Sequence, residues 1–176
     1  MFIFKNKKIE QSSKLYNKIL FLSRNNIFYT KFQLSDSFQN RIILIFFHTA
    51  FLLVKFKIMN RDKNYKKFSQ DMFDLVFNEI ELNMRELGYG DVSVNKNMKF
   101  LVKAFYNILL ECENYSELTA KNKKIFLFKY LTSNANISNK LDHYLIEYFN
   151  QFQAFCFDLD LDSVLRGDLK FNYNQI

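Results

Sequence analysis

The sequence predicts an all-α protein, a single compact irregular bundle of about six helices. The chain has 176 residues, which is the size of one domain. It has no Pro and only three Gly, which excludes turn-rich β architectures and glycine-rich phosphate loops. Apolar residues make up 49% of the chain and recur at the spacings of three and four that one face of a helix requires. Residues 1–11 are predicted to form a basic N-terminal tail and residues 12–171 the helical domain.

Two helices are predicted in the first third of the chain. The first covers about residues 12–24, where apolar residues recur every three or four positions. The second covers about residues 41–57 and follows Asp36 and Gln39, a pair with the spacing of a capping box. Its apolar run, 42–54, predicts a buried central helix, because thirteen residues span only about 20 Å. A membrane-spanning helix and a shallow interfacial helix are the alternatives.

A long helix and a sharp corner are predicted in the middle of the chain, after a polar loop at 60–65. The apolar face of this helix consists of Phe68, Met72, Leu75, Val76, Ile80, Met84 and Leu87. Gly88 then falls at the position where a residue with positive φ ends a helix. Asp91 or Ser93 is expected to cap the next helix, whose apolar face consists of Val94, Met98, Leu101, Phe105, Ile108, Leu109 and Cys112.

Two further helices are predicted toward the C-terminus. One covers about residues 119–131, and Ser138 is expected to cap the other. The apolar stripe of that last helix consists of Leu141, Tyr144, Leu145, Tyr148, Phe152 and Phe155. The chain after Asp158 lacks a regular pattern and predicts irregular structure.

Positive charge is concentrated in the first part of the chain. Residues 1–67 carry 14 Lys and Arg against three acidic residues, a net of +11. Residues 68–176 carry 11 against 15, a net of −4, so that the two parts sum to +7. Such polarity is compatible with binding to lipid headgroups, ribosomal RNA or DNA, or with a solvated basic face that binds nothing.

The titratable residues predict neither an enzyme nor a cofactor or metal site. His48 lies within the apolar run and is interpreted as a core residue with a hydrogen-bond partner. Cys112 and Cys156 have no metal-binding spacing and are expected to be two buried thiols. The alternating acids that begin at Asp158 lack the Gly and the final Glu of a calcium loop.

Two linked motifs in the middle of the chain carry a resemblance to a known family. The first motif consists of Gln70, Phe73, Asp74 and Phe77. The second consists of Arg85, Glu86, Gly88, Gly90, Asp91, Val94 and Lys96, and is followed by Phe105 and Tyr106. A looser upstream match consists of Phe28, Tyr29, Asp36, Arg41 and His48. Together these residues resemble the signature of the ubiquinol–cytochrome c chaperone family, with Asn40 where the family pattern has Gly.

The resemblance implies a non-enzymatic chaperone that binds newly made cytochrome b. Such a protein supports assembly of ubiquinol–cytochrome c reductase, which is respiratory complex III. The implied partners are cytochrome b as client, with the membrane surface, the ribosome and a second assembly factor as further possibilities. The implied location is the cytoplasmic side of the inner membrane in a bacterium, as a peripheral protein, or the mitochondrion in a eukaryote. A basic nucleic-acid- or ribosome-binding module and a lipid-surface-binding protein are the alternatives.

The corner in the second motif also has a physical interpretation of its own. Gly88 can end one helix with positive φ, and Gly90 is expected to permit close approach of the next helix. Glu86 lies at a helix C-terminus, where a negative charge is unfavourable, and this predicts a cationic partner. Lys96 and a client are the two candidates for that partner. The alternative is that the motif forms only a precise helix–helix corner.

Overall fold

The structure is a computed structural model that describes residues 2–59, 63–133, 139–160, 163–164, 166–167 and 169–173. Its described part is helical. The β-type pairing in this part of the chain is limited to an isolated bridge between Leu34 and Ser133. The elements in chain order are α1 (Phe2–Ser23), α2 (Ile27–Thr30), α3 (Phe38–Met59), α4 (Lys63–Glu86), α5 (Asp91–Glu113), the 3₁₀ helix η1 (Tyr115–Glu117), α6 (Ala120–Phe128) and α7 (Asn139–Asp158). The prediction of an all-α bundle is confirmed.

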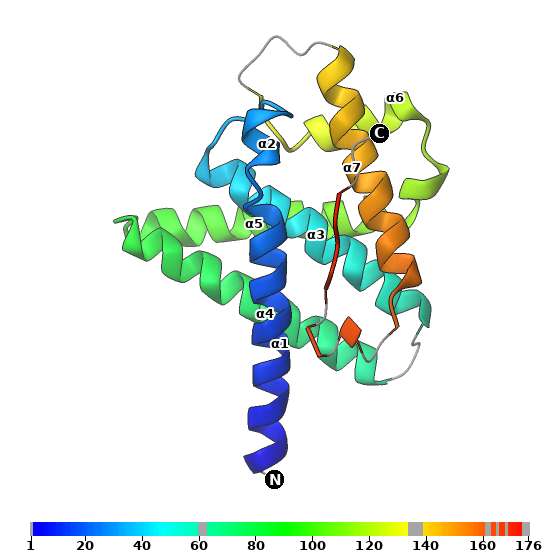
Figure 1. The fold of residues 1–176 in the computed structure, drawn as a ribbon. Coiled ribbons are helices and arrows are strands. Elements are labelled where there is room, and N and C mark those ends of the chain that lie inside the picture. The colour runs from blue at the N-terminus through cyan, green and yellow to red at the C-terminus, as the bar shows by residue number, and fades with distance from the viewer. Residues whose placement is uncertain are drawn as a thin grey trace.

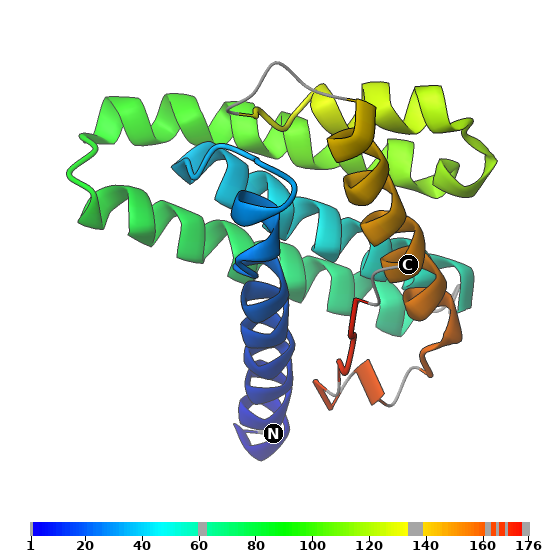
Figure 2. The same cartoon turned by 45° about the horizontal axis from the view of Figure 1, so that its top comes forward.

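Helix α3 is the centre of the bundle. Every residue from Ile42 to Val54 is buried, so the helix is covered on all sides. Helices α1, α4, α5 and α7 all pack against it, as Figures 1 and 2 show. A helix that is apolar all round needs such a surrounding, and the prediction of a buried central helix is confirmed. No helix in the described part of the chain combines the length and hydropathy needed to cross a membrane.

Helix α1 begins earlier than its apolar spacing predicts. It starts at Phe2 rather than near residue 12, and its N-terminal half projects from the body of the molecule (Figure 1). The predicted inward residues Leu15, Ile19 and Leu22 are buried against the bundle. The division between a tail at 1–11 and a domain at 12–171 stays a prediction, and the backbone of α1 runs through that boundary.

The start of α3 differs from the predicted capping box. Ser37, not Asp36, is the capping residue, since its Oγ accepts the backbone N–H of Asn40 at 3.2 Å. Asp36 instead accepts two hydrogen bonds from Arg41, at 2.7 and 2.9 Å. The capping-box prediction is therefore wrong by one residue, because a stronger charged partner for Asp36 lies within reach on the first turn.

Asn40 joins the start of α3 to the segment before α7. Its side chain is fully buried. Its Nδ2 donates to the backbone oxygens of Ser35 and Thr132, both at 2.7 Å, and its Oδ1 accepts the N–H of Thr132 at 3.0 Å. The amide therefore satisfies backbone groups that would otherwise be buried without partners. A glycine, which the family pattern has at this position, could supply none of these bonds.

The predicted later helices are present with shifted ends. Thr119 caps α6 by accepting the N–H of Asn122 at 3.3 Å, and α6 ends at Phe128 rather than near residue 131. Ser138, the expected cap of α7, lies outside the described residues. The prediction that Tyr144 belongs to the apolar stripe of α7 is wrong, since 41% of this residue is exposed.

The segment after α7 returns to the body of the bundle, beside α1 and α7 (Figure 1). Gly167 has φ +76°, and a Cβ on it would lie 2.9 Å from Cβ of Lys14. This is the close glycine contact of the fold, and the sequence pattern did not indicate it. Phe171 and Tyr173 pack their rings 5.4 and 5.3 Å from the ring of Tyr148. The segment thus covers one face of α7.

Candidate functional site

The corner between α4 and α5 is closed by backbone hydrogen bonds around Gly88. Gly88 has φ +85°, its N–H donates to the oxygen of Arg85 at 3.0 Å, and the N–H of Tyr89 donates to Met84 at 3.1 Å. This pair of bonds defines a Schellman motif, in which the residue with positive φ is normally glycine. The predicted role of Gly88 is confirmed.

Gly90 and Asp91 have roles that differ from the predicted ones. Gly90 is the N-cap of α5, and a Cβ on it would have no heavy atom within 4 Å. The close helix approach expected there is therefore wrong. Asp91 is the first residue of α5 rather than its cap, and Ser93 is exposed within the first turn. A carboxylate in this turn still interacts favourably with the helix dipole.

Substitutions at these two glycines are expected to have opposite effects on the free energy of unfolding. Gly88→Ala should lower the free energy of unfolding by about 1 kcal/mol, because alanine disfavours positive φ. Gly90→Ser should raise it by a few tenths of a kcal/mol, since serine adds a side-chain acceptor at an N-cap that has none. Urea denaturation of both variants measures these changes. Equal losses in the two variants would contradict the assigned backbone roles.

An ion pair crosses the corner. Arg85 donates from Nη1 to Asp91 at 2.5 Å and from Nε and Nη2 to Glu81 at 3.1 and 2.9 Å. The hydrogen bond to Asp91, and then that to Glu81, raises the pKa of Arg85. Glu86 and Lys96 are both exposed, and neither makes an ion pair with any residue that the structure describes. The cationic partner predicted for Glu86 is therefore not Lys96 in this structure.

Three apolar side chains of the corner residues are exposed to solvent. Leu87 is 60% exposed, Tyr89 41% and Val92 84%, and we call these three residues the corner patch. The ring of Phe38, at the start of α3, lies 6.4 Å from the ring of Tyr89. The prediction of Leu87 on the apolar face of the helix is wrong, because α4 ends one residue before it. The sequence pattern does not indicate Tyr89 or Val92, since loop and first-turn residues have no periodicity.

The aromatic residues of the predicted motifs form packing contacts instead of an exposed site. Phe77 and Phe105 are buried, with ring centroids 5.7 Å apart, and both contact Phe46 of α3. Phe73 is half-buried and stacks at 5.6 Å on Tyr106, which is 48% exposed. These contacts hold the α4–α5 hairpin to α3.

The polar pair of the first motif lies on the outside of α4. Gln70 donates to Asp74 at 2.7 Å, one turn along the helix, and both residues are exposed. The two side chains contact each other rather than the corner. They are not part of the corner patch.

The upstream match divides into a buried part and a surface part. His48 is fully buried, its Nδ1 lies 2.7 Å from the oxygen of Leu44, and its Nε2 lies 2.8 Å from the hydroxyl of Tyr148. Because a carbonyl only accepts, Nδ1 carries the hydrogen, and Nε2 accepts from the hydroxyl. Burial lowers the pKa of His48 from 6.5 to about 4. The ring of Phe28 lies 6.0 Å away and is also buried, so the interpretation of His48 as a core residue is confirmed.

The surface part of the upstream match lies at the start of α3. Arg41 and Asp36 form an exposed bidentate ion pair. The hydrogen bond from Arg41 lowers the pKa of Asp36. Tyr29 is half-buried, and burial raises its pKa. The contact between Phe38 and Tyr89 places this end of α3 beside the corner.

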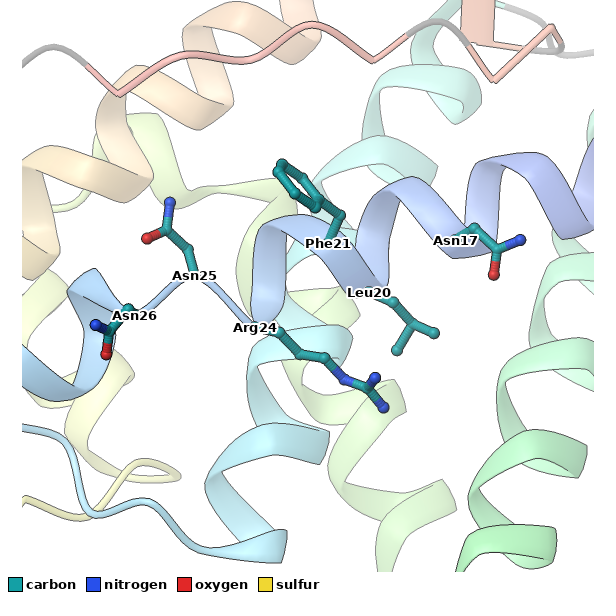
Figure 3. Close-up of a pocket in the computed structure, with 6 residues that line it drawn as sticks. All are labelled: Asn17, Leu20, Phe21, Arg24, Asn25 and Asn26. Carbon is teal, nitrogen blue, oxygen red and sulfur yellow. The ribbon is translucent and has the colours of Figure 1, made fainter.

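Two hollows lie at the C-terminal end of α1. One has a volume of about 600 Å³ and is lined by Asn17, Leu20, Phe21, Arg24, Asn25 and Asn26 (Figure 3). The other, of about 350 Å³, shares Phe21 and Asn25 and is bordered by the rings of Tyr148, Phe171 and Tyr173. Phe21 is 76% exposed. The sequence pattern indicates neither hollow. The first is lined by residues 17–26 alone, whereas the second also needs α7 and the segment after it.

The described residues contain no group of three or more His, Cys, Asp or Glu side chains that could hold a metal ion. Cys112 and Cys156 are free and buried, as predicted, and burial raises the pKa of both thiols.

The fold and the corner define an all-helical protein with apolar side chains exposed at the α4–α5 corner. The family model described as ubiquinol-cytochrome C chaperone matches residues 30–117, half of the 176-residue chain. The chain belongs to this family of complex III assembly chaperones, and the predicted resemblance is confirmed.

A solved structure has the same fold. The crystal structure of the Cbp3 homolog from Brucella abortus superposes with a TM-score of 0.80 at 20% sequence identity. The match covers 96% of this chain and 92% of that one. At this identity the likeness is one of fold. A search of curated proteins gave no match.

Proposed function

We propose that this protein is a non-enzymatic chaperone that binds newly made cytochrome b and holds it for assembly into complex III. The family to which the chain belongs supports the assembly role. We further propose that the protein acts at the membrane surface as a peripheral protein. Binding to the ribosome and to a second assembly factor stay predictions that depend on the family resemblance alone.

The observation that carries the proposal is the corner patch. An exposed apolar cluster rimmed by polar groups is typical of a protein-binding site. Leu87, Tyr89 and Val92 are exposed on a corner whose backbone is held by the Schellman motif and by the Arg85–Asp91 ion pair. A rigid apolar surface loses little conformational entropy when it binds a partner. The corner patch is therefore suited to binding an apolar segment of a protein that is not yet assembled into a complex.

The charges around the corner patch complement such a client. Glu81, Glu86 and Asp91 outnumber Arg85 there, so the corner is acidic although the chain as a whole is basic. Membrane-spanning segments are followed by Lys and Arg on their cytoplasmic side. We expect the corner patch to contact the apolar end of a segment, and Glu86 to pair with the cationic residues that follow it.

Capture of cytochrome b tests this proposal. The tagged full-length protein should co-purify with cytochrome b from detergent-solubilised membranes. The double substitution Leu87→Ser and Val92→Ser should reduce the recovered cytochrome b about tenfold, because it removes two apolar contacts of more than about 1 kcal/mol combined. Both side chains are exposed, so the melting temperature should not change.

A matched control separates a local effect from a general loss of surface hydrophobicity. Ile58 and Ile125 are 58% and 57% exposed on other helices, and their joint replacement by Ser should leave capture unchanged. Loss of capture in Phe21→Ser, with normal capture in the corner variant, would place the client in the hollows of α1 instead. Failure of the unmodified protein to capture cytochrome b would contradict the proposed function itself.

A further inference from the structure

The outward side of α5 carries a row of lysines interleaved with exposed apolar residues. We define this α5 outer face by Lys96, Lys99, Phe100, Lys103 and Leu110. All five side chains are exposed, with Phe100 at 59% and Leu110 at 61%. In Figure 2 helix α5 lies along one edge of the molecule. Two large apolar side chains therefore lie on the same side of α5 as three exposed lysines.

The α5 outer face is straight and rigid. Lys96, Lys99, Lys103 and Leu110 are separated by three, four and seven positions, which places them on one side of a helix over about 21 Å. The opposite side, with Leu101, is buried in the bundle. The packing of α5 in the bundle therefore keeps these side chains on one line before any binding partner is present.

The charge of the α5 outer face is not neutralised by any residue that the structure describes. No acidic residue occurs between Asp91 and Glu111 in the sequence. Glu111 already binds Lys129 at 2.6 Å, and Glu113 binds Lys57 at 2.6 Å. The three lysines of the face make no ion pair with any residue that the structure describes. The face thus presents a local positive charge within residues 68–176, although that part of the chain has a net charge of −4.

We propose that the α5 outer face docks on the surface of a bilayer that contains anionic lipids. Lysine side chains reach headgroup phosphates with their ammonium groups while their methylene stems cover apolar surface. Phe100 and Leu110 would enter the boundary between headgroups and acyl chains, as the apolar residues of interfacial helices do. A nucleic acid would match the lysines, but it offers no apolar environment for the aliphatic Leu110. The combination of both residue types on one straight face favours the bilayer.

This inference rests on the peripheral placement proposed above, but not on the identity of the client. The corner patch lies at the N-terminal end of α5, so docking through the α5 outer face would hold the corner near the membrane surface. Most of the positive charge of the chain lies in residues 1–67. The inference assigns membrane attachment to a different part of the chain, namely α5.

Vesicle sedimentation with the full-length protein tests the proposal. The protein should bind vesicles of phosphatidylcholine with 30% phosphatidylglycerol, and 0.5 M NaCl should release it, because exposed charges are then strongly screened. Replacing Lys96, Lys99 and Lys103 with Gln should lower the partition coefficient roughly 10²-fold. Phe100→Ser should lower it several-fold, whereas Ile125→Ser, an equally exposed residue on α6, should not change it.

The matched control removes the same charge from the basic part of the chain. Lys18, Lys66 and Lys67 are exposed on α1 and α4, and their joint replacement by Gln should reduce binding far less. Equal losses in the two triple variants would overturn the proposal, because attachment would then follow net charge alone. Binding to single-stranded RNA that only the α5 variant weakens, without vesicle binding, would overturn it in favour of a nucleic acid. Capture of cytochrome b from detergent extracts is a separate measurement, so failure of either proposal can be recognised by itself.

Discussion

Acidification from pH 6.5 to pH 4 is expected to lower the free energy of unfolding by about 3 kcal/mol through His48 alone. Burial lowers the pKa of this residue from 6.5 in the unfolded chain to about 4 in the folded protein. Well above pH 6.5 the imidazole is neutral in both states, and its titration has no effect on stability. As the pH falls toward 4, only the unfolded chain takes up the proton, so unfolding becomes more favourable. Each unit of pKa difference corresponds to about 1.4 kcal/mol.

The apolar environment of the imidazole is the physical cause of the low pKa of His48. The rings of Tyr148, Phe149 and Phe152 lie 5.7, 5.6 and 4.7 Å from it, and no carboxylate is among its hydrogen-bond partners. The hydrogen bond to the backbone oxygen of Leu44 raises the pKa and offsets only part of this effect of burial. The folded protein therefore resists protonation until the pH is near 4.

Urea denaturation across this pH range measures the effect. Carboxylates also titrate there, so the informative quantity is the difference between the wild-type protein and a variant without the buried imidazole. The double variant H48F/Y148F replaces both hydrogen-bonded partners with apolar rings and leaves neither group unsatisfied. H143Q is the matched control, because His143 is exposed on α7 and its loss should leave the acid response intact. An unchanged acid response in H48F/Y148F would contradict the assignment to His48.

Phe28→Ala is expected to lower the free energy of unfolding by about 3–5 kcal/mol. Phe28 is fully buried, and its ring lies 5.6 Å from that of Phe32 and 4.8 Å from that of Tyr148. Its removal would leave a cavity between α2, α3 and α7, and the aromatic neighbours have little freedom to fill it. The sequence resemblance predicts Phe28 as a motif residue, but its contacts are those of a core residue.

The matched comparison is Phe21→Ala. Phe21 lies seven residues earlier in the chain, on α1, and is 76% exposed, so its truncation should change stability by no more than about 0.5 kcal/mol. Urea denaturation of the two variants at neutral pH measures the difference. A Phe28→Ala protein with normal stability and reduced capture of cytochrome b would contradict the structural role and place Phe28 in a client site.

Local features of the sequence were sufficient to predict the helices and the backbone role of Gly88. The apolar run 42–54 has no polar side, and a helix of that kind is stable in water only at the centre of a bundle. Gly88 follows a long amphipathic helix directly, and the backbone there needs a residue that tolerates positive φ. Both conclusions depend on neighbours within a few residues, which the sequence contains.

The roles of charged and exposed residues required the tertiary structure. Asp36 and Asp91 both have the sequence context of helix caps, but in the folded protein each binds an arginine, Arg41 and Arg85 respectively. Those partners are five and six residues away, and their geometry depends on how the chain turns. A capping pattern therefore could not distinguish a cap from one half of an ion pair.

The sequence by itself determined that this protein is an all-α bundle around one apolar helix, and that it carries the motifs of a complex III assembly chaperone. Only the tertiary structure decided which motif residues are buried and which are exposed. Phe77, a motif residue outside the predicted apolar face, is buried, whereas Leu87, Tyr89 and Val92 are exposed. Close packing requires a glycine at position 167 and not at position 90, because Lys14 of α1 packs against the backbone of Gly167. Helical periodicity is a local property, but exposure depends on contacts between distant segments, and no short pattern encodes those contacts.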